Sequence, residues 1–157
     1  ELIEGEILTM APIGFNHSGH IARLIHALTP LLANQAVINA QNPVQLGDLS
    51  EPEPDLMVLR PDPNFYTTHH PKAADVFLLI EVSDSTLRFD RGQKLRLYAN
   101  HQIPEYWIVN LIDHCLEVYR QPENGDYRDK TVLGKTDQIN LLALPEIQVA
   151  VESILGR

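Results

Sequence analysis

The chain has 157 residues, of which 44% are hydrophobic, and its formal net charge at pH 7 is −9. This length and composition predict a single domain, residues 1–157, with a core large enough to fold without disulfides. The acidic balance argues against a protein that is held to nucleic acid mainly by a basic surface, but it is compatible with a nuclease whose positive groups are local.

The single cysteine, Cys115, cannot form an internal disulfide, which fits a reducing compartment, so we expect a cytoplasmic location. No apolar run approaches the length of a membrane span, and no signal peptide is visible. The sequence begins at Glu1 rather than at a methionine, which leaves open what precedes it.

The N-terminal part predicts a strand or hairpin in residues 1–12, a helix, and then one or two short strands in residues 36–46. The helix should run from about His17 to Asn34, with Asn16 as its N-cap and a bend at Pro30. Its apolar positions follow the 3.6-residue period and are Ile21, Leu24, Ile25, Leu28, Leu31 and Leu32.

Residues 76–83, VFLLIEVS, predict a strand that is buried on both faces. Because side chains alternate on a strand, Glu81 should share a face with Phe77, Leu79 and Ser83. A buried carboxylate is unfavourable unless it is paired or binds a metal. We therefore interpret Glu81 as a metal ligand; the alternative is a strand-end carboxylate that reaches solvent or forms a buried ion pair.

A second carboxylate, Asp55, stands at the start of a short buried strand, residues 56–59. If this strand lies beside the strand that carries Glu81, both carboxylates can bind one divalent ion, for which Mg²⁺ or Mn²⁺ is suited. Such an ion activates water and stabilises charge on a phosphodiester. The alternative is that Asp55 is only a turn residue after Pro54.

The following segment predicts a helix from about Leu87 to His101, capped by Ser85 or Thr86. Asp90 and Lys94 are four residues apart and should face the same way, either as a surface ion pair or with Lys94 near Glu81, where it can orient water or neutralise a phosphate. The same helix carries three arginines that can contact a phosphate backbone: Arg88, Arg91 and Arg96.

The remainder predicts strands at 105–111 and 115–120, a hairpin turn at 123–126, and a tail with one short strand and a final strand or helical turn. Residues 76–111 have the length of a parallel strand–helix–strand crossover. We therefore expect an α/β (α+β) fold, in which a mixed sheet is flanked by helices.

Several ordered motifs resemble those of a known family. Pro54-Asp55 followed by Glu81-Val82-Ser83 resembles the PD-(D/E)xK motif of restriction-endonuclease-like nucleases. The longer strings PEPDLMVL, IEVSDSTLRFDRGQKLRLYANHQIPEYWIV and LEVYRQPENGDY, with the N-terminal ELIEGEILTMAPIGFNHSGHIARLIHAL, are similar to the Uma-type bacterial endonucleases within that superfamily. The resemblance covers nearly the whole chain.

The resemblance implies a restriction-endonuclease-like fold and Mg²⁺-dependent (or Mn²⁺-dependent) phosphodiester hydrolysis, with Asp55, Glu81 and the backbone carbonyl of Val82 as metal ligands. Ser83 departs from the motif, because it stands where a lysine is expected and a hydroxyl carries no charge. Lys94 can supply the missing amine.

Two further residues can support this site. Asp90 can orient Lys94 or contribute to the metal site. His17 matches a family histidine that can contact the substrate or lie near the site; the alternative for His17 is a capping or packing role.

The sequence thus predicts a divalent-metal-dependent endonuclease that acts on nucleic acid, DNA above all, and works as a homodimer. The alternatives are a catalytically inactive nuclease-fold module for binding or assembly, and a metal-dependent hydrolase of other phosphoesters.

Overall fold

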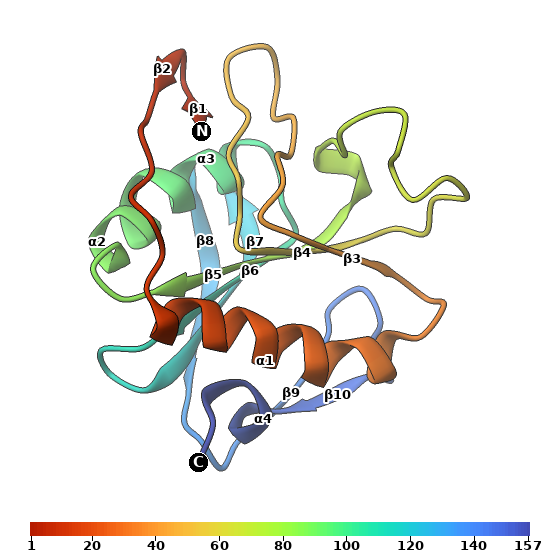
Figure 1. The fold of residues 1–157 in the computed structure, drawn as a ribbon, viewed down its shortest axis with the longest axis vertical. Coiled ribbons are helices and arrows are strands. Elements are labelled where there is room, and N and C mark those ends of the chain that lie inside the picture. Colours follow the sequence, from red (N-terminus) through yellow and green to blue (C-terminus); the bar gives the residue numbers. More distant parts are fainter.

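A six-stranded mixed sheet forms the centre of the computed structural model, which describes residues 1–157 (Figure 1). The strand order is β3-β4-β5-β6-β7-β8, and only β5 and β6 run parallel. The strands are β3 (Val37–Ala40), β4 (Leu56–Leu59), β5 (Val76–Ser83), β6 (Glu105–Asn110), β7 (Cys115–Glu123) and β8 (Asp126–Leu133). The parallel pair confirms the predicted strand–helix–strand crossover, and the mixed sheet flanked by helices confirms the expected fold class.

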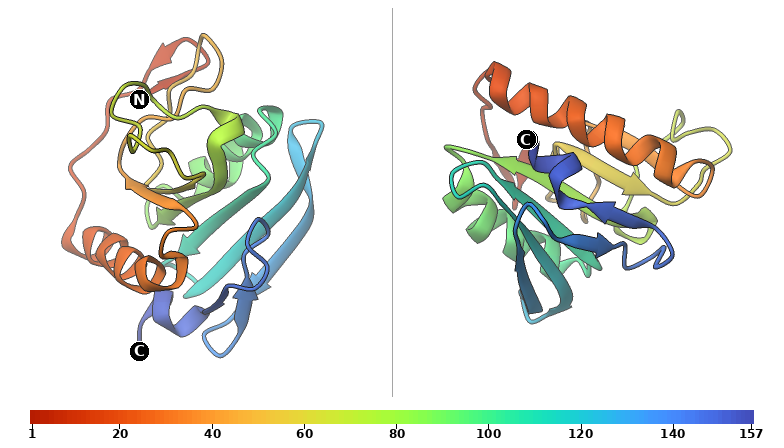
Figure 2. Two further views of the ribbon diagram at one scale, coloured as in Figure 1. Left: turned by 90° about the vertical axis from the view of Figure 1, so that its right-hand side faces the viewer. Right: turned by 90° about the horizontal axis from the view of Figure 1, so that it is seen from below.

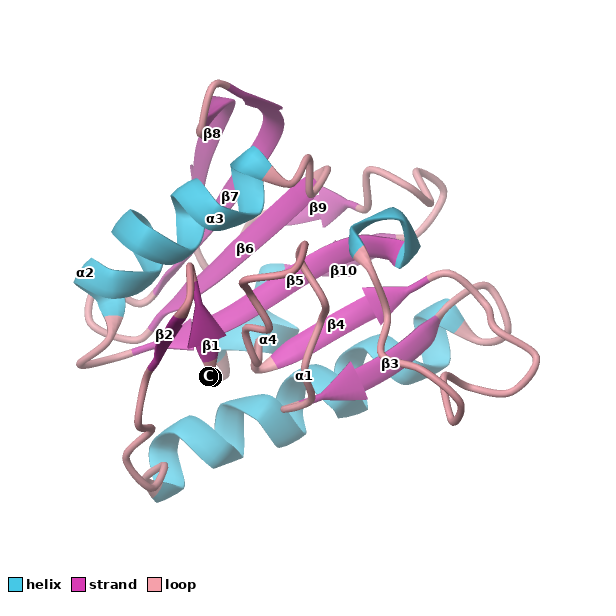
Figure 3. Cartoon of the chain, turned by 90° about the horizontal axis from the view of Figure 1, so that it is seen from above, coloured by secondary structure: helices cyan, strands magenta, loops and turns pink.

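Helices cover both faces of the sheet (Figures 2 and 3). One face packs against α1 (Phe15–Leu32), α4 (Val151–Leu155) and the small sheet of β9 (Gln138–Asn140) and β10 (Gln148–Ala150). The opposite face packs against a continuous helical segment made of α2 (Leu87–Phe89), the π-helical turn η2 (Asp90–Lys94) and α3 (Leu95–Asn100). The remaining elements are the hairpin β1 (Leu2–Ile3) and β2 (Glu6–Ile7) and the 3₁₀ turn η1 (Ala73–Asp75).

The apolar run of β5 is explained by this two-sided burial. Leu78, Ile80 and Val82 pack in the cluster beneath α1, whereas Leu79 packs in the cluster beneath α3. The prediction that Phe77 shares the face of Glu81 is wrong. A β-bulge opposite Leu59 shifts the register there, so Phe77 packs against the cluster on the α1 side.

Helix α1 follows its predicted period, with four buried leucine and isoleucine residues at spacings of three and four: Ile21, Leu24, Leu28 and Leu32. It begins earlier than predicted, because Gly14 rather than Asn16 is the N-cap. Ile25 and Leu31 are exposed at the edge of the apolar stripe. Pro30 lies inside the last turn, where the helix ends two residues later. No helix in the fold combines the length and the apolar character that crossing a membrane requires.

A buried carboxylate on β7 ties the helical segment to the sheet. The Glu117 carboxylate accepts hydrogen bonds from the Arg91 guanidinium, the Asn110 amide at 2.8 Å and the Tyr119 hydroxyl at 2.5 Å. Although burial by itself raises the pKa of Glu117, these donors outweigh it and hold the pKa below its ordinary value.

Replacing this carboxylate should weaken the fold in a pH-dependent way. Because the folded-state pKa of Glu117 is lowered, its contribution is fully present above the ordinary value of 4.5 and is lost as the pH falls through the folded-state value. Glu117→Gln should lower the free energy of unfolding at pH 7 by about 1–3 kcal/mol. In urea titrations the difference from wild type should shrink below pH 4.5, whereas Glu123→Gln, in an exposed pair with Arg128, should change little. A pH-independent difference for Glu117→Gln would contradict this.

Candidate active site

The register of two neighbouring strands brings Asp55 and Glu81 together. Leu56 on β4 lies opposite Ile80 on β5, so Asp55, one residue earlier, falls opposite Glu81. Both side chains are buried on the face that α2–α3 covers. The backbone N–H of Asp55 points at Glu81 Oε2, 3.4 Å away. The predicted convergence of the two carboxylates is therefore present in the fold.

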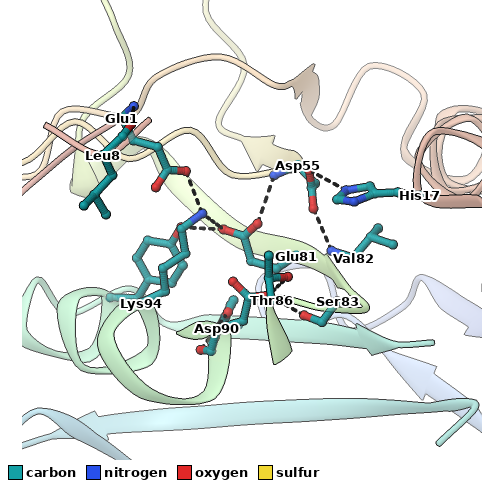
Figure 4. A network of polar contacts seen from close by, with 12 residues as sticks. Glu1, Leu8, His17, Asp55, Glu81, Val82, Ser83, Thr86, Asp90 and Lys94 are labelled. Carbon is teal, nitrogen blue, oxygen red and sulfur yellow. Dashed lines mark hydrogen bonds and ion pairs between the residues drawn. The ribbon is translucent and has the colours of Figure 1, made fainter. Parts of the chain in front are cut away.

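The Asp55 carboxylate continues the pairing of β4 and β5 beyond the end of β4. Its Oδ2 accepts a hydrogen bond from the backbone N–H of Val82 at 2.8 Å. Its Oδ1 lies 2.9 Å from His17 Nε2 at the start of α1 (Figure 4). Asp55 is therefore held by the neighbouring strand and by the helix on the opposite face of the sheet.

The Glu81 carboxylate is held by two donors from the helical segment on its own face. Its Oε1 accepts hydrogen bonds from Lys94 Nζ at 2.9 Å and from the Tyr98 hydroxyl at 2.7 Å. Lys94 Nζ also donates to Glu1 Oε1 at 2.8 Å. All four side chains are buried. The amine that Ser83 lacks thus comes from the helix and lies directly against Glu81.

The π-helical turn η2 explains how Asp90, Lys94 and Tyr98 share one face. They are spaced four residues apart, and each such step displaces a side chain by about 40° around an α-helix, so three in a row would drift apart. The wider turn of η2 at Asp90–Lys94 removes part of that drift. The Asp90 carbonyl in this turn accepts the Tyr106 hydroxyl at 3.1 Å, which satisfies a backbone group of the irregular turn.

Ser83, which stands at the lysine position of the PD-(D/E)xK motif, contacts Asp90. Its hydroxyl donates to Asp90 Oδ2 at 2.6 Å, and the Thr86 hydroxyl donates to the same oxygen at 2.7 Å. Asp90 is thus positioned by two hydroxyls, and no hydrogen bond joins it to Lys94. Burial raises the pKa of Asp90, and the two hydroxyl donors oppose the shift.

A cavity of about 530 Å³ opens onto the cluster of polar side chains formed by Asp55, Glu81, Asp90 and Lys94. Its floor contains Asp55, Glu81, Asp90 and Lys94, and His17 lies on its wall. The extended segment 8–14, between β2 and α1, forms one side, and residues 84–86 form the other. The cavity is large enough for one phosphodiester group with its neighbouring atoms, so the cluster is accessible to a substrate.

The electrostatics of the cluster follow from burial and pairing. Burial raises the pKa of Glu81 well above its ordinary range, and the Lys94 ammonium opposes that shift. Burial lowers the pKa of Lys94, but the Glu81 and Glu1 carboxylates outweigh it, so the amine stays protonated. The Asp55 carboxylate, whose Oδ1 lies 2.9 Å from Nε2, raises the pKa of His17.

The donor set matches the chemistry of a hard divalent ion. No three His, Cys, Asp or Glu side chains gather into a metal-binding group on their own. However, Mg²⁺ is commonly bound through one or two carboxylates and keeps several waters.

The backbone of β5 shows where the Val82 carbonyl points. The Val82 N–H donates to Asp55 on the β4 side of the strand, whereas the Ser83 carbonyl accepts a hydrogen bond from the Leu111 N–H on the β6 side. Because N–H and C=O of one strand residue share an edge, the Val82 carbonyl points to the same edge as Asp55.

The three arginines differ in their surroundings. Arg88 and Arg96 are exposed and form no ion pair. Arg91 is bound to Glu117 and lies 3.7 Å from Asp113, so its charge is already balanced by carboxylates of the chain. Arg88 and Arg96 are therefore the two arginines of this segment whose charge is not balanced by a carboxylate of the chain.

Two residues that contact the cluster were not predicted as site residues. Tyr98 is a core residue, and its hydroxyl also binds Glu81. Glu1 lies 93 residues from Lys94 in the sequence, and no spacing pattern links the two. The four-residue spacing from Asp90 through Lys94 to Tyr98 was the one signal in the sequence that could have identified Tyr98.

The site thus combines Asp55 and Glu81, at the facing ends of β4 and β5, with Lys94 from the helical segment, in a mixed sheet that is flanked by helices. The chain belongs to the Uma2 family, described as "Putative restriction endonuclease", whose model matches residues 1–152. Among curated proteins none matches the chain. Its fold is similar to that of a crystal structure described as "a putative nuclease belonging to DUF820" from Anabaena variabilis, with a TM-score of 0.79, 15% sequence identity, and coverage of 98% of this chain and 88% of that one.

Removing the buried amine should destabilise the protein whatever its activity. Lys94→Met leaves the Glu81 and Glu1 carboxylates buried without their cation, so the free energy of unfolding should fall by about 3–5 kcal/mol. Lys130→Met, which removes the cation of an exposed pair with Asp126, should change it by less than about 1 kcal/mol. Urea unfolding at pH 7 measures both; equal effects would contradict the assignment of a buried pair.

Proposed function

We propose that this chain, as one restriction-endonuclease-like domain, is a divalent-metal-dependent endonuclease that hydrolyses phosphodiester bonds of DNA. The observation that supports this most directly is the convergence of Asp55, Glu81 and Lys94 in one accessible cavity. Membership of a family described as "Putative restriction endonuclease" agrees with it.

In this proposal Asp55, Glu81 and the Val82 carbonyl hold the ion. When bound, the ion polarises the phosphodiester and supplies an activated water for attack. His17 keeps Asp55 in place from the α1 side, and Tyr98 keeps Glu81 in place from the α3 side. The Lys94 ammonium adds positive charge beside Glu81, where it stabilises the charge that develops on the phosphate. Asp90 is held by Ser83 and Thr86 on the floor of the same cavity.

We further propose that two copies act together, so that each cuts one strand. Sedimentation of the protein with and without DNA tests this. A homodimer that converts supercoiled plasmid directly to linear product supports it, whereas a monomer that only nicks contradicts it.

The test of the activity is cleavage of plasmid DNA and of DNA and RNA oligonucleotides with Mg²⁺ or Mn²⁺. Wild type should cut, EDTA should stop it, and Asp55→Ala should lower the rate by about a hundredfold or more, because a metal ligand is lost. The control Asp48→Ala, at an exposed position outside the cavity, should cut like wild type. A protein that neither cleaves nor binds Mn²⁺ would be a module that retains the fold without the activity. Turnover of small phosphodiesters without nucleic-acid binding would indicate another phosphoesterase.

Binding of the DNA backbone should depend on the two unpaired arginines. Arg88→Ala and Arg96→Ala should each weaken binding uniformly across sequences and reduce the slope of log K against log salt by about one. Arg128→Ala, on the exposed face of β8 and paired with Glu123, should not. Fluorescence anisotropy with Ca²⁺ in place of Mg²⁺ measures binding without turnover, and unchanged slopes for Arg88→Ala and Arg96→Ala would place the DNA elsewhere.

A further inference from the structure

The Glu1 side chain lies deep in the molecule although it comes from the hairpin β1–β2 at the edge of the fold. It is fully buried, and its Oε1 accepts a hydrogen bond from Lys94 Nζ at 2.8 Å. Its Oε2 is also buried and has no hydrogen-bond partner within the chain. Lys94 is therefore the one side chain that balances this carboxylate.

The position of Glu1 is fixed by the segment that carries the metal-binding aspartate. Leu2 exchanges backbone hydrogen bonds with Glu51, at 3.3 and 2.7 Å, only four residues before Asp55. Ile3, two residues after Glu1, is completely buried in the core beneath α3. Glu1 is thus attached to the scaffold of the site rather than resting loosely against it.

Lys94 is held between two carboxylates that lie on different sides of its amine (Figure 4). Glu81 lies on the cavity side and is a proposed metal ligand, whereas Glu1 does not line the cavity. A divalent ion on Glu81 would compete with Lys94 for the same carboxylate and would repel its positive charge. Glu1, behind the amine, is the carboxylate that still holds it under those conditions.

We infer that Glu1 is a positioning residue, which anchors the Lys94 ammonium from behind so that it stays beside Glu81 when a divalent cation is bound. This inference rests on the proposed function for its catalytic consequence, but the placement of Lys94 can be tested without any turnover. Tyr98 cannot take over this role, because its hydroxyl binds Glu81 and not Lys94.

The first arm of the test measures how well Lys94 is held. Wild type, Glu1→Gln and the control Glu6→Gln, an exposed residue of the same hairpin, are acetylated with Mn²⁺ present, and the modification of Lys94 is followed by peptide mass spectrometry. Glu1→Gln should raise the rate at Lys94 by about fivefold or more, because its neutral amide no longer retains the cation. An unchanged rate would overturn the inference. If Glu1→Gln does not fold, as judged by circular dichroism, Glu1→Ala takes its place.

The second arm measures the consequence for cleavage. In Glu1→Gln, kcat should fall about tenfold or more, because the amine is displaced, while KM and the Kd for Mn²⁺ alone stay within about twofold. In a Lys94→Met background the same change should have no further effect on kcat. A loss that adds to that of Lys94→Met, or a parallel loss of Mn²⁺ affinity, would instead indicate a general structural role. If wild type does not cleave, the proposed function fails, and the acetylation arm alone decides the inference.

Discussion

The contact between Glu81 and Lys94 is the interaction on which the rest of this site depends. It joins the end of a largely buried strand to the helix that crosses above it, and both side chains are almost fully buried. A lone charge in either place would be strongly unfavourable, so each residue requires the other. The pair also leaves Glu81 with its second oxygen directed toward Asp55. The ion pair that stabilises the fold therefore also orients the Glu81 carboxylate toward Asp55.

The chain differs from the PD-(D/E)xK motif in the element that carries the cation beside Glu81. The strand position that carries lysine in the general motif holds Ser83, and that hydroxyl is used to position Asp90. The amine comes instead from the neighbouring helix, where an irregular turn widens the spacing enough to align Asp90 and Lys94 with Tyr98. In this fold the cation beside Glu81 is therefore carried by the helical segment and not by β5.

Parts of this arrangement could be predicted from the sequence because they follow from periodicity. The apolar run of β5 predicts a buried strand, and the order of the predicted strands and helices gives the fold class. The meeting of Asp55 with Glu81 is predicted only on the condition that their strands are neighbours, and by the resemblance to the PD-(D/E)xK motif. The bulge at Phe77 could not be predicted, since it depends on how β4 and β5 pair. The Gly14 cap, the partnership of Arg91 with Glu117 and the burial of Glu1 likewise depend on contacts between distant segments, which no local pattern records.

The groups around the cavity are not equally secure within the fold. Asp55, Glu81 and Lys94 sit on the central strands and on a helix that is packed into the core, so exposing them requires most of the molecule to open. His17, by contrast, sits in the first turn of α1, at a helix end that no side chain caps. The free energy of local opening is lower for such helix ends than for the core, and amide hydrogen exchange measures the two separately. The first turn of α1, with His17, can therefore open locally while Asp55, Glu81 and Lys94 stay assembled.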